Sequence, residues 1–120
     1  LPYARDIAAA MPAMAVFPSA EGSLAEAHAS GFAGCISATT NQTGALCARL
    51  WANKTDPDPK LTEDITTLRG LIAAEALIPS IKYLVGQRNG HREWENMAPP
   101  FQPVTDARKA QLQQVLDLLT

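Results

Sequence analysis

An alternation of short apolar runs and helical patterns between Met14 and Leu50 constrains this chain most. Residues 13–17 and 34–37 are apolar runs of strand length, and each precedes a stretch with helical spacing. Strands that alternate with helices are typical of parallel β/α units. Two such strands leave both sheet edges unpaired and bury little apolar surface. The pattern therefore predicts an α/β fold in which these two units belong to a larger sheet or barrel.

The ends of these elements follow from local signals. Pro18 ends the first apolar run, and a helical stretch opens at Gly22 and stops at Gly31. After the second run, residues 39–41 supply Thr-Thr-Asn as a cap for a helix that runs to about Ala52. The sequence thus predicts two consecutive β/α units.

Further helices are predicted where apolar residues recur three or four positions apart, the spacing of one helical face. They cover residues 2–11, 60–76, 78–85 and 106–119. Between the last two, Pro99-Pro100 predicts an extended segment, because proline disfavours helix in the residue before it. We therefore expect the last β/α units of a barrel in residues 1–55 and a C-terminal helical region in residues 56–120.

Composition excludes several classes of protein. Hydrophobic residues make up 47% and charged residues 18% of the chain, which is typical of a globular domain. The net charge is −2 with both signs interspersed, so neither a nucleic acid nor a membrane is expected as a partner.

Leu1 is no initiator methionine and opens no signal peptide, so we expect a piece of a longer protein. Cys35 and Cys47 match no zinc or redox spacing, which favours buried thiols in a reducing, cytoplasmic compartment.

The candidate site follows from where ligands bind in parallel β/α folds, at the carboxyl ends of the strands. These ends are Pro18–Gly22 and Ser37–Asn41, and both are rich in small polar residues. Such segments hold anions on backbone N–H groups, or they are plain loop and cap residues. Glu21 is the one acidic residue there: it positions a substrate hydroxyl or acts as a base, or it is a first-turn acid that the helix dipole favours. His28 and His91 lack neighbours at ligand spacing, so we expect structural or solvated roles and no metal site.

Three stretches, taken in order, carry a resemblance to a known family. They are Val16–Glu21 (Val-Phe-Pro-Ser-Ala-Glu), the Gly-Cys-Ile-Ser core within Gly31–Asn41, and the pair Ile78–Lys82 and Ala98–Phe101. Together they resemble the seventh strand, the eighth strand and the C-terminal helical region of the dihydrodipicolinate synthase and N-acetylneuraminate lyase family. The order and spacing agree over nearly the whole chain.

The resemblance implies a (β/α)8 TIM barrel that cleaves or condenses 2-keto acids through a lysine imine of pyruvate. It implies a homo-oligomer, dimer or tetramer, with no separate cofactor, and it places the catalytic lysine on a strand before Leu1. By the same comparison, Ile36 covers the pyruvate, and Ser19 stands where the family usually has a pocket glycine. The serine departs from that pattern, because its side chain narrows the pocket or adds a hydroxyl. Ser37 and Glu21, at the predicted strand ends, are the further substrate-binding candidates.

No lysine of this sequence lies at a predicted strand end, where an imine-forming amine is needed. Lys82 lies inside an apolar helix, where we expect a paired structural charge. Two other readings stay open: a non-catalytic fragment that serves as an interaction surface, and an unrelated β/α binding domain. In every case the isolated chain is expected to expose Val16 and Ile36 and to aggregate or require a partner.

Overall fold

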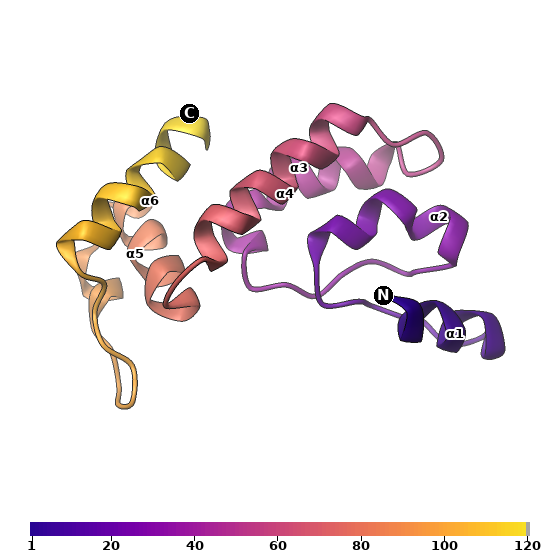
Figure 1. The fold of residues 1–120 in the computed structure, drawn as a ribbon, viewed down its shortest axis with the longest axis horizontal. Helices are drawn as coiled ribbons and strands as arrows, with labels where there is room; N and C mark the ends of the chain where they lie inside the picture. Colours follow the sequence, from indigo (N-terminus) through magenta and orange to yellow (C-terminus); the bar gives the residue numbers. More distant parts are fainter. Residues whose placement is uncertain (120) are drawn as a thin grey trace. The chain divides into compact units, whose positions relative to one another are not determined.

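The computed structural model describes residues 1–119, and all of its regular elements in that range are helical (Figure 1). The predicted α/β fold, with the last two β/α units of a TIM barrel, is therefore wrong for this structure, because residues 1–119 form no β-strand. The α-helices are α1 (Pro2–Ala10), α2 (Ala27–Ser30), α3 (Thr40–Ala52), α4 (Pro59–Ala73), α5 (Leu77–Asn89) and α6 (Asp106–Leu119). Two 3₁₀ helices, η1 (Glu21–Glu26) and η2 (Arg92–Glu95), complete the set.

The two segments predicted as strands lie side by side as irregular chain. The backbone N–H of Ala33 donates to the carbonyl of Val16 at 2.9 Å, and that of Ile36 donates to the carbonyl of Pro18 at 3.0 Å. In both bonds the second segment supplies the N–H donor and the first supplies the carbonyl acceptor. The two segments run in the same direction. The pairing slips by one residue between the two bonds, and Pro18 has no N–H to extend it. A lone parallel pair of this kind does not form a regular ladder.

Gly34 adds a second interruption to the pairing. Its φ is 153°, a value that residues with a side chain rarely adopt. A Cβ at this position would lie 3.1 Å from the Phe17 ring of the neighbouring segment. The glycine therefore lets the two segments approach closely, in a backbone conformation that departs from a regular strand.

The predicted helices are present with small changes at their ends. The stretch predicted from Gly22 begins as η1, continues as α2 and ends at Gly31, which has a φ of 70° in the left-handed region. That conformation is the usual reason for glycine at a helix C-terminus. The helix expected to end near Ala52 is α3, with Thr39 as its N-cap residue.

Packing divides the chain into two compact units, Leu1–Thr66 and the residues from Thr67 onward. The core of the first unit joins η1, α3 and the first part of α4. It consists of Leu24, Cys47, Leu50, Leu61 and Ile65.

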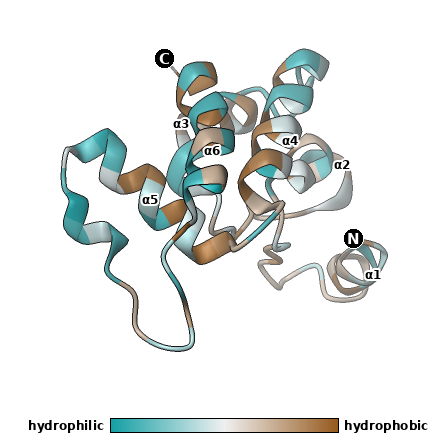
Figure 2. Ribbon diagram, turned by 60° about the vertical axis from the view of Figure 1, so that its left-hand side comes forward, coloured by the Kyte–Doolittle hydropathy of each residue, from teal (hydrophilic) through white to brown (hydrophobic). Residues whose placement is uncertain are grey.

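The second unit contains the end of α4 together with α5, η2 and α6. Apolar residues that follow helical spacing are buried in both units, and α4 carries both hydrophilic and hydrophobic residues along its length (Figure 2). Those buried in the second unit are Leu68, Ile72, Ile81, Leu84, Leu112 and Val115. Helical periodicity was thus the reliable signal in this half of the chain.

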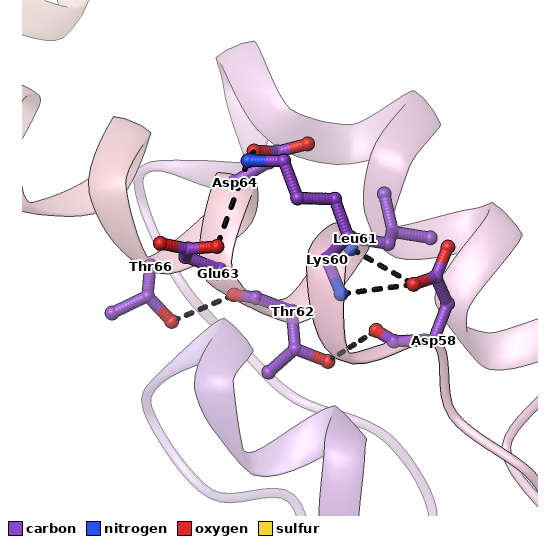
Figure 3. A network of polar contacts seen from close by, with 7 residues as sticks. All are labelled: Asp58, Lys60, Leu61, Thr62, Glu63, Asp64 and Thr66. Atoms are coloured by element: carbon purple, nitrogen blue, oxygen red, sulfur yellow. Dashed lines mark hydrogen bonds and ion pairs between the residues drawn. The ribbon is translucent and has the colours of Figure 1, made fainter.

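The start of α4 lies one residue before the predicted helix and is capped by Asp58. The carboxylate of Asp58 accepts hydrogen bonds from the backbone N–H groups of Lys60, at 2.9 Å, and Leu61, at 3.4 Å (Figure 3). Pro59 is the first helical residue, where its missing N–H costs nothing. The Lys60 ammonium then pairs with Asp64 at 2.7 Å, one turn along the helix.

Pro99 and Pro100 form a turn rather than the predicted extended segment. The N–H of Phe101 donates to the carbonyl of Ala98 at 3.1 Å and closes it. The peptide bond between the two prolines is cis. Two adjacent prolines exclude helix here, as expected, but leave room for a tight turn.

Arg108 is a buried charged residue of α6, with only 5% of its surface exposed, and it anchors this helix within the second unit. Its guanidinium donates to the carbonyls of Leu71 and Ile72 at 2.8 and 2.9 Å, and to Ser80 Oγ at 3.2 Å. These carbonyls belong to the last turn of α4, where they have no partner within the helix. The buried arginine therefore satisfies a helix end.

Candidate functional site

The two coil segments place the predicted site residues at a common end. The backbone bond between Ile36 and Pro18 joins the two segments, and Ser37 and Ser19 are the next residues of each. Ser19 is exposed and Ser37 is half-buried. Ile36 precedes Ser37, and 71% of its surface is exposed. The backbone bond therefore brings Ser19, Ile36 and Ser37 to neighbouring positions of the two segments.

Glu21 lies directly behind that end and is completely buried. Its Oε2 accepts a hydrogen bond from Ser37 Oγ at 2.8 Å. Its Oε1 accepts one from Thr39 Oγ1 and a longer one from Thr43 Oγ1 at 3.1 Å. The carboxylate is therefore caged by hydroxyl donors from the second coil segment, from the start of α3 and from its first turn.

The hydroxyl cage decides the ionisation of Glu21. Burial raises the pKa of this carboxyl, but hydrogen bonds from Thr39, from the backbone N–H of Glu21 itself, and from Ser37 and Thr43 outweigh it. The net result is a pKa below the usual range, so Glu21 is a carboxylate at neutral pH. Because it has no exposed surface, Glu21 is not accessible to a ligand from solvent.

Cys47 continues the same polar column one turn further along α3. Its Sγ donates to Thr43 Oγ1 at 3.6 Å. Burial raises the pKa of the thiol; the Thr43 hydrogen bond opposes this and the nearby Glu21 charge adds to it. Cys47 is therefore a protonated thiol at neutral pH, which is a poor nucleophile. Cys35 is half-buried, and neither cysteine is in a disulfide.

The cage has one member that was not a candidate, Thr43, and one, Thr39, that belonged to the candidate segment Ser37–Asn41 but was singled out only as a helix cap. Thr39 was expected to cap α3, but its side chain makes no cap hydrogen bond and donates to Glu21 instead. The available signal was the spacing: Thr39, Thr43 and Cys47 recur every fourth residue and therefore share one helix face. A face of small polar residues opposite a lone acid predicts such a cage.

All four lysines are engaged with neighbours in their own part of the chain. Lys54 lies 4.4 Å from the ring centre of Trp51, and Lys82 donates to the carbonyl of Asn96 at 2.5 Å. The ammonium groups of Lys60 and Lys109 pair with Asp64 and Glu95 respectively, and these contacts raise the pKa of both. Lys82 was expected to pair with a charged group, and its hydrogen-bond partner is instead the backbone carbonyl of Asn96.

The two histidines lie outside this arrangement of side chains. His28 is exposed on α2, and His91 lines a shallow hollow of about 380 Å³ with Lys82, Glu93 and Trp94. Within residues 1–119, no group of three or more His, Cys, Asp or Glu side chains is placed to hold a metal ion. In the same range, every helix is too short or too polar to cross a bilayer.

Comparison with protein-family models, with curated proteins and with solved structures finds no match to this chain. The functional assignment therefore depends on the side chains of the site and on the motifs that supply them.

Proposed function

We propose that this chain supplies one side of the keto-acid site in a Schiff-base lyase or synthase of the dihydrodipicolinate synthase and N-acetylneuraminate lyase type. The supporting observation is the common end of the two coil segments. These carry the motifs that resemble the family, and they bring Ser19, Ile36 and Ser37 to one place. The proposed substrate is pyruvate or a related 2-keto acid.

The side chains at this end suit the two halves of a keto acid. Ile36 offers an exposed apolar surface that can cover the methyl and carbonyl carbons. Ser19 is exposed on the neighbouring segment, and its hydroxyl can hydrogen-bond a polar group. The motif gives glycine at this position in the family, so the Ser19 side chain restricts the space available to larger keto acids.

The reacting amine comes, in this proposal, from a lysine outside residues 1–120. An imine forms from a neutral amine in a desolvated pocket, with loss of water from the amine and the ketone. Lys60 and Lys109 have raised pKa values, opposite to what imine formation needs. Lys54 covers Trp51, and Lys82 is tied to the carbonyl of Asn96.

A non-catalytic interaction module is the second candidate, and the exposed apolar residues favour it. Met14, Phe17 and Ile36 are 48%, 47% and 71% exposed, and all lie on the two coil segments. Apolar side chains gathered in this way gain free energy when a partner covers them. A module of this kind needs no keto acid, so the response to pyruvate separates the two proposals.

The test has two parts. Borohydride reduction with pyruvate should leave the 120-residue chain unmodified, and should label a lysine outside residues 1–120 when the sequence upstream of Leu1 is expressed with it. Pyruvate should also shift the methyl resonances of Ile36 in the 120-residue chain, and Ile36→Ala should weaken this binding. Ile78→Ala is the control, because Ile78 is an exposed isoleucine of the second unit, with 39% of its surface exposed.

The proposal fails if acetate produces the same shifts as pyruvate, because recognition of the keto group would then be absent. Trapping of pyruvate on Lys82 of the isolated chain would overturn the assignment of the amine to a residue outside it.

A further inference from the structure

The short η2 helix of the second unit is tied to two longer helices by lysine side chains. Lys82, on α5, donates to the carbonyl of Asn96 at 2.5 Å. The ammonium group of Lys109, on α6, pairs with Glu95 at 2.9 Å. Both bonds act at the C-terminal end of η2, so this end has a fixed position against α5 and α6.

Gly86 brings the other end of η2 onto the backbone of α5. The N–H of His91 donates to the carbonyl of Gly86 at 3.0 Å. A Cβ on Gly86 would lie 2.9 Å from the carbonyl oxygen of His91 and 3.2 Å from Cβ of Trp94, so a side chain there would push η2 away. The place of Trp94 beside α5 is therefore set by backbone contact.

Trp94 is held in this place but is not buried. Its surface is 45% exposed, and within residues 1–119 its indole has no hydrogen bond, ring contact or cation–π contact. The ring of Trp51, in contrast, is covered by the ammonium group of Lys54 at 4.4 Å. Indole rings contribute most when they are covered. A positioned and uncovered indole thus presents a flat apolar surface that is ready for a ligand.

Lys82 adds a positive charge beside this surface. It lines the hollow of about 380 Å³ together with His91, Glu93 and Trp94, and small-molecule sites have volumes of about 300–1,000 Å³. An ammonium group has three N–H donors, and the carbonyl of Asn96 takes one of them. Among residues 1–119 no carboxylate pairs with Lys82. Its charge and two of its donors therefore remain for an acceptor in the hollow.

Glu93 limits how much negative charge this hollow accepts. Its side chain is 80% exposed, and its carboxylate lies 3.9 Å from Nδ1 of His91. Water screens such an exposed charge, whereas the half-buried Lys82 is fixed by its bond to Asn96. The hollow therefore favours one negative charge, and Glu93 opposes a second one. A carboxylate fits this balance better than a doubly charged phosphate does.

We propose that this hollow binds a planar aromatic carboxylate, with its ring against Trp94 and its carboxylate on the ammonium group of Lys82. All residues of the hollow belong to the second unit, whereas Ser19 and Ile36 belong to the first. This binding site is therefore independent of the proposed keto-acid site, and each can fail without the other.

The test compares three probes of similar size on the full 120-residue chain: benzoate, cyclohexanecarboxylate and benzylammonium. The indole Nε1–H resonance of Trp94 reports binding, and that of Trp51 is the internal control. Benzoate should shift Trp94 and leave Trp51 unchanged. It should bind roughly two- to tenfold more tightly than cyclohexanecarboxylate, the ratio that an aromatic contact provides. Benzylammonium should bind the least of the three.

Variants identify the charge that selects the ligand. Lys82→Met should weaken benzoate binding roughly three- to tenfold, because the acceptor loses a charged donor at a half-buried position. Arg92→Gln is the matched control, since Arg92 is an exposed cation of η2 that does not line the hollow. It should keep the wild-type affinity. A loss of equal size in both variants would overturn the proposal, because the attraction would then be nonspecific.

Glu93→Gln gives a test of opposite sign that does not depend on the stability of Lys82→Met. Glu93 is 80% exposed, so the variant should fold. It should strengthen the binding of benzoate, and of phenyl phosphate by a larger factor, because phosphate carries about 1.5–2 charges. Unchanged binding of both would overturn the proposed balance of charge. Equal binding of benzoate and benzylammonium to the wild type, or equal shifts of Trp94 and Trp51, would overturn the site itself.

Discussion

Replacing Glu21 by glutamine should destabilise the first unit at neutral pH, and the size of the effect follows from its hydrogen bonds. The side chain keeps its shape but loses its charge, so three hydroxyl donors face an amide. A hydrogen bond to a charged group contributes about 1.5–3 kcal/mol and a neutral one about 0.5–1.5 kcal/mol, a difference of about 1 kcal/mol for each bond. Three bonds give about 3 kcal/mol before desolvation is considered. Burying a neutral amide costs less than burying a carboxylate, so the expected net loss is about 1–2 kcal/mol.

The same substitution has a pH signature with a definite sign. The pKa of Glu21 is lower in the folded chain than its ordinary value of 4.5. Between these two values the unfolded chain binds more protons, so the stabilisation by Glu21 is fully present above pH 4.5 and is lost as pH falls through the folded-state pKa. The difference in stability between wild type and Glu21→Gln should therefore be largest at neutral pH and shrink in acid.

Urea unfolding followed by far-ultraviolet circular dichroism measures this difference at each pH. Glu26→Gln is the control on the same helix; its carboxylate pairs with Arg5 at 2.6 Å near the surface, so its effect at neutral pH should be the smaller one. A Glu21→Gln penalty that stays constant or grows below pH 4.5 would refute the ionised, hydroxyl-bound carboxylate.

Three further predictions concern helix ends, each measured by the same urea unfolding. Arg108→Leu should cost about 2–4 kcal/mol, because two buried carbonyls of α4 lose their donor, whereas Arg92→Leu at an exposed site should change little. Asp58→Ala should cost about 1 kcal/mol, because two N–H groups at the start of α4 lose their cap; an unchanged midpoint would contradict this. Ala76→Gly should stabilise by up to about 1 kcal/mol, because Ala76 has a φ of 41° in the left-handed region; a loss of stability would show that no strain is relieved.

The helices of the second unit could be predicted because their signal is local and repeated. The spacing of Leu68 and Ile72 along α4, and of Leu112 and Val115 along α6, matches the turn of a helix, and all four are buried. Such a pattern needs only one apolar face and a partner surface. The ends were less certain, and the Asp58 cap was missed although Asp58 directly precedes the Pro59 that begins α4.

Residues 13–17 and 34–37 were wrongly predicted as strands, because whether a strand forms depends on its partner. Residues 13–17 and 34–37 have the apolar composition of strands, and the chain does run them side by side. A regular ladder also needs matching N–H groups and carbonyls on both sides. Pro18 and Gly34 disturb that match, and the composition of either run alone does not show it.

The cage around Glu21 was only half visible in the sequence. Glu21 and Ser37 were both candidates, but as separate groups that face a substrate. Their hydrogen bond joins residues that are 16 positions apart in the chain, a separation at which spacing rules give no guidance. Thr43 follows from the helical repeat that begins at Thr39, once the acid is known to lie opposite that face.

The candidate site combines a buried charge with an exposed apolar side chain, the reverse of the usual distribution. Ser37 keeps its position through polar contacts with Glu21 and Thr39, and Ile36 contributes little packing because 71% of it is exposed. Truncating Ile36 therefore removes a surface without disturbing the hydroxyl cage, whereas changing Glu21 alters the cage without touching the surface. Effects on the exposed surface and on the buried cage are consequently separable by mutation, even though Ile36 and Ser37 are neighbours in the chain.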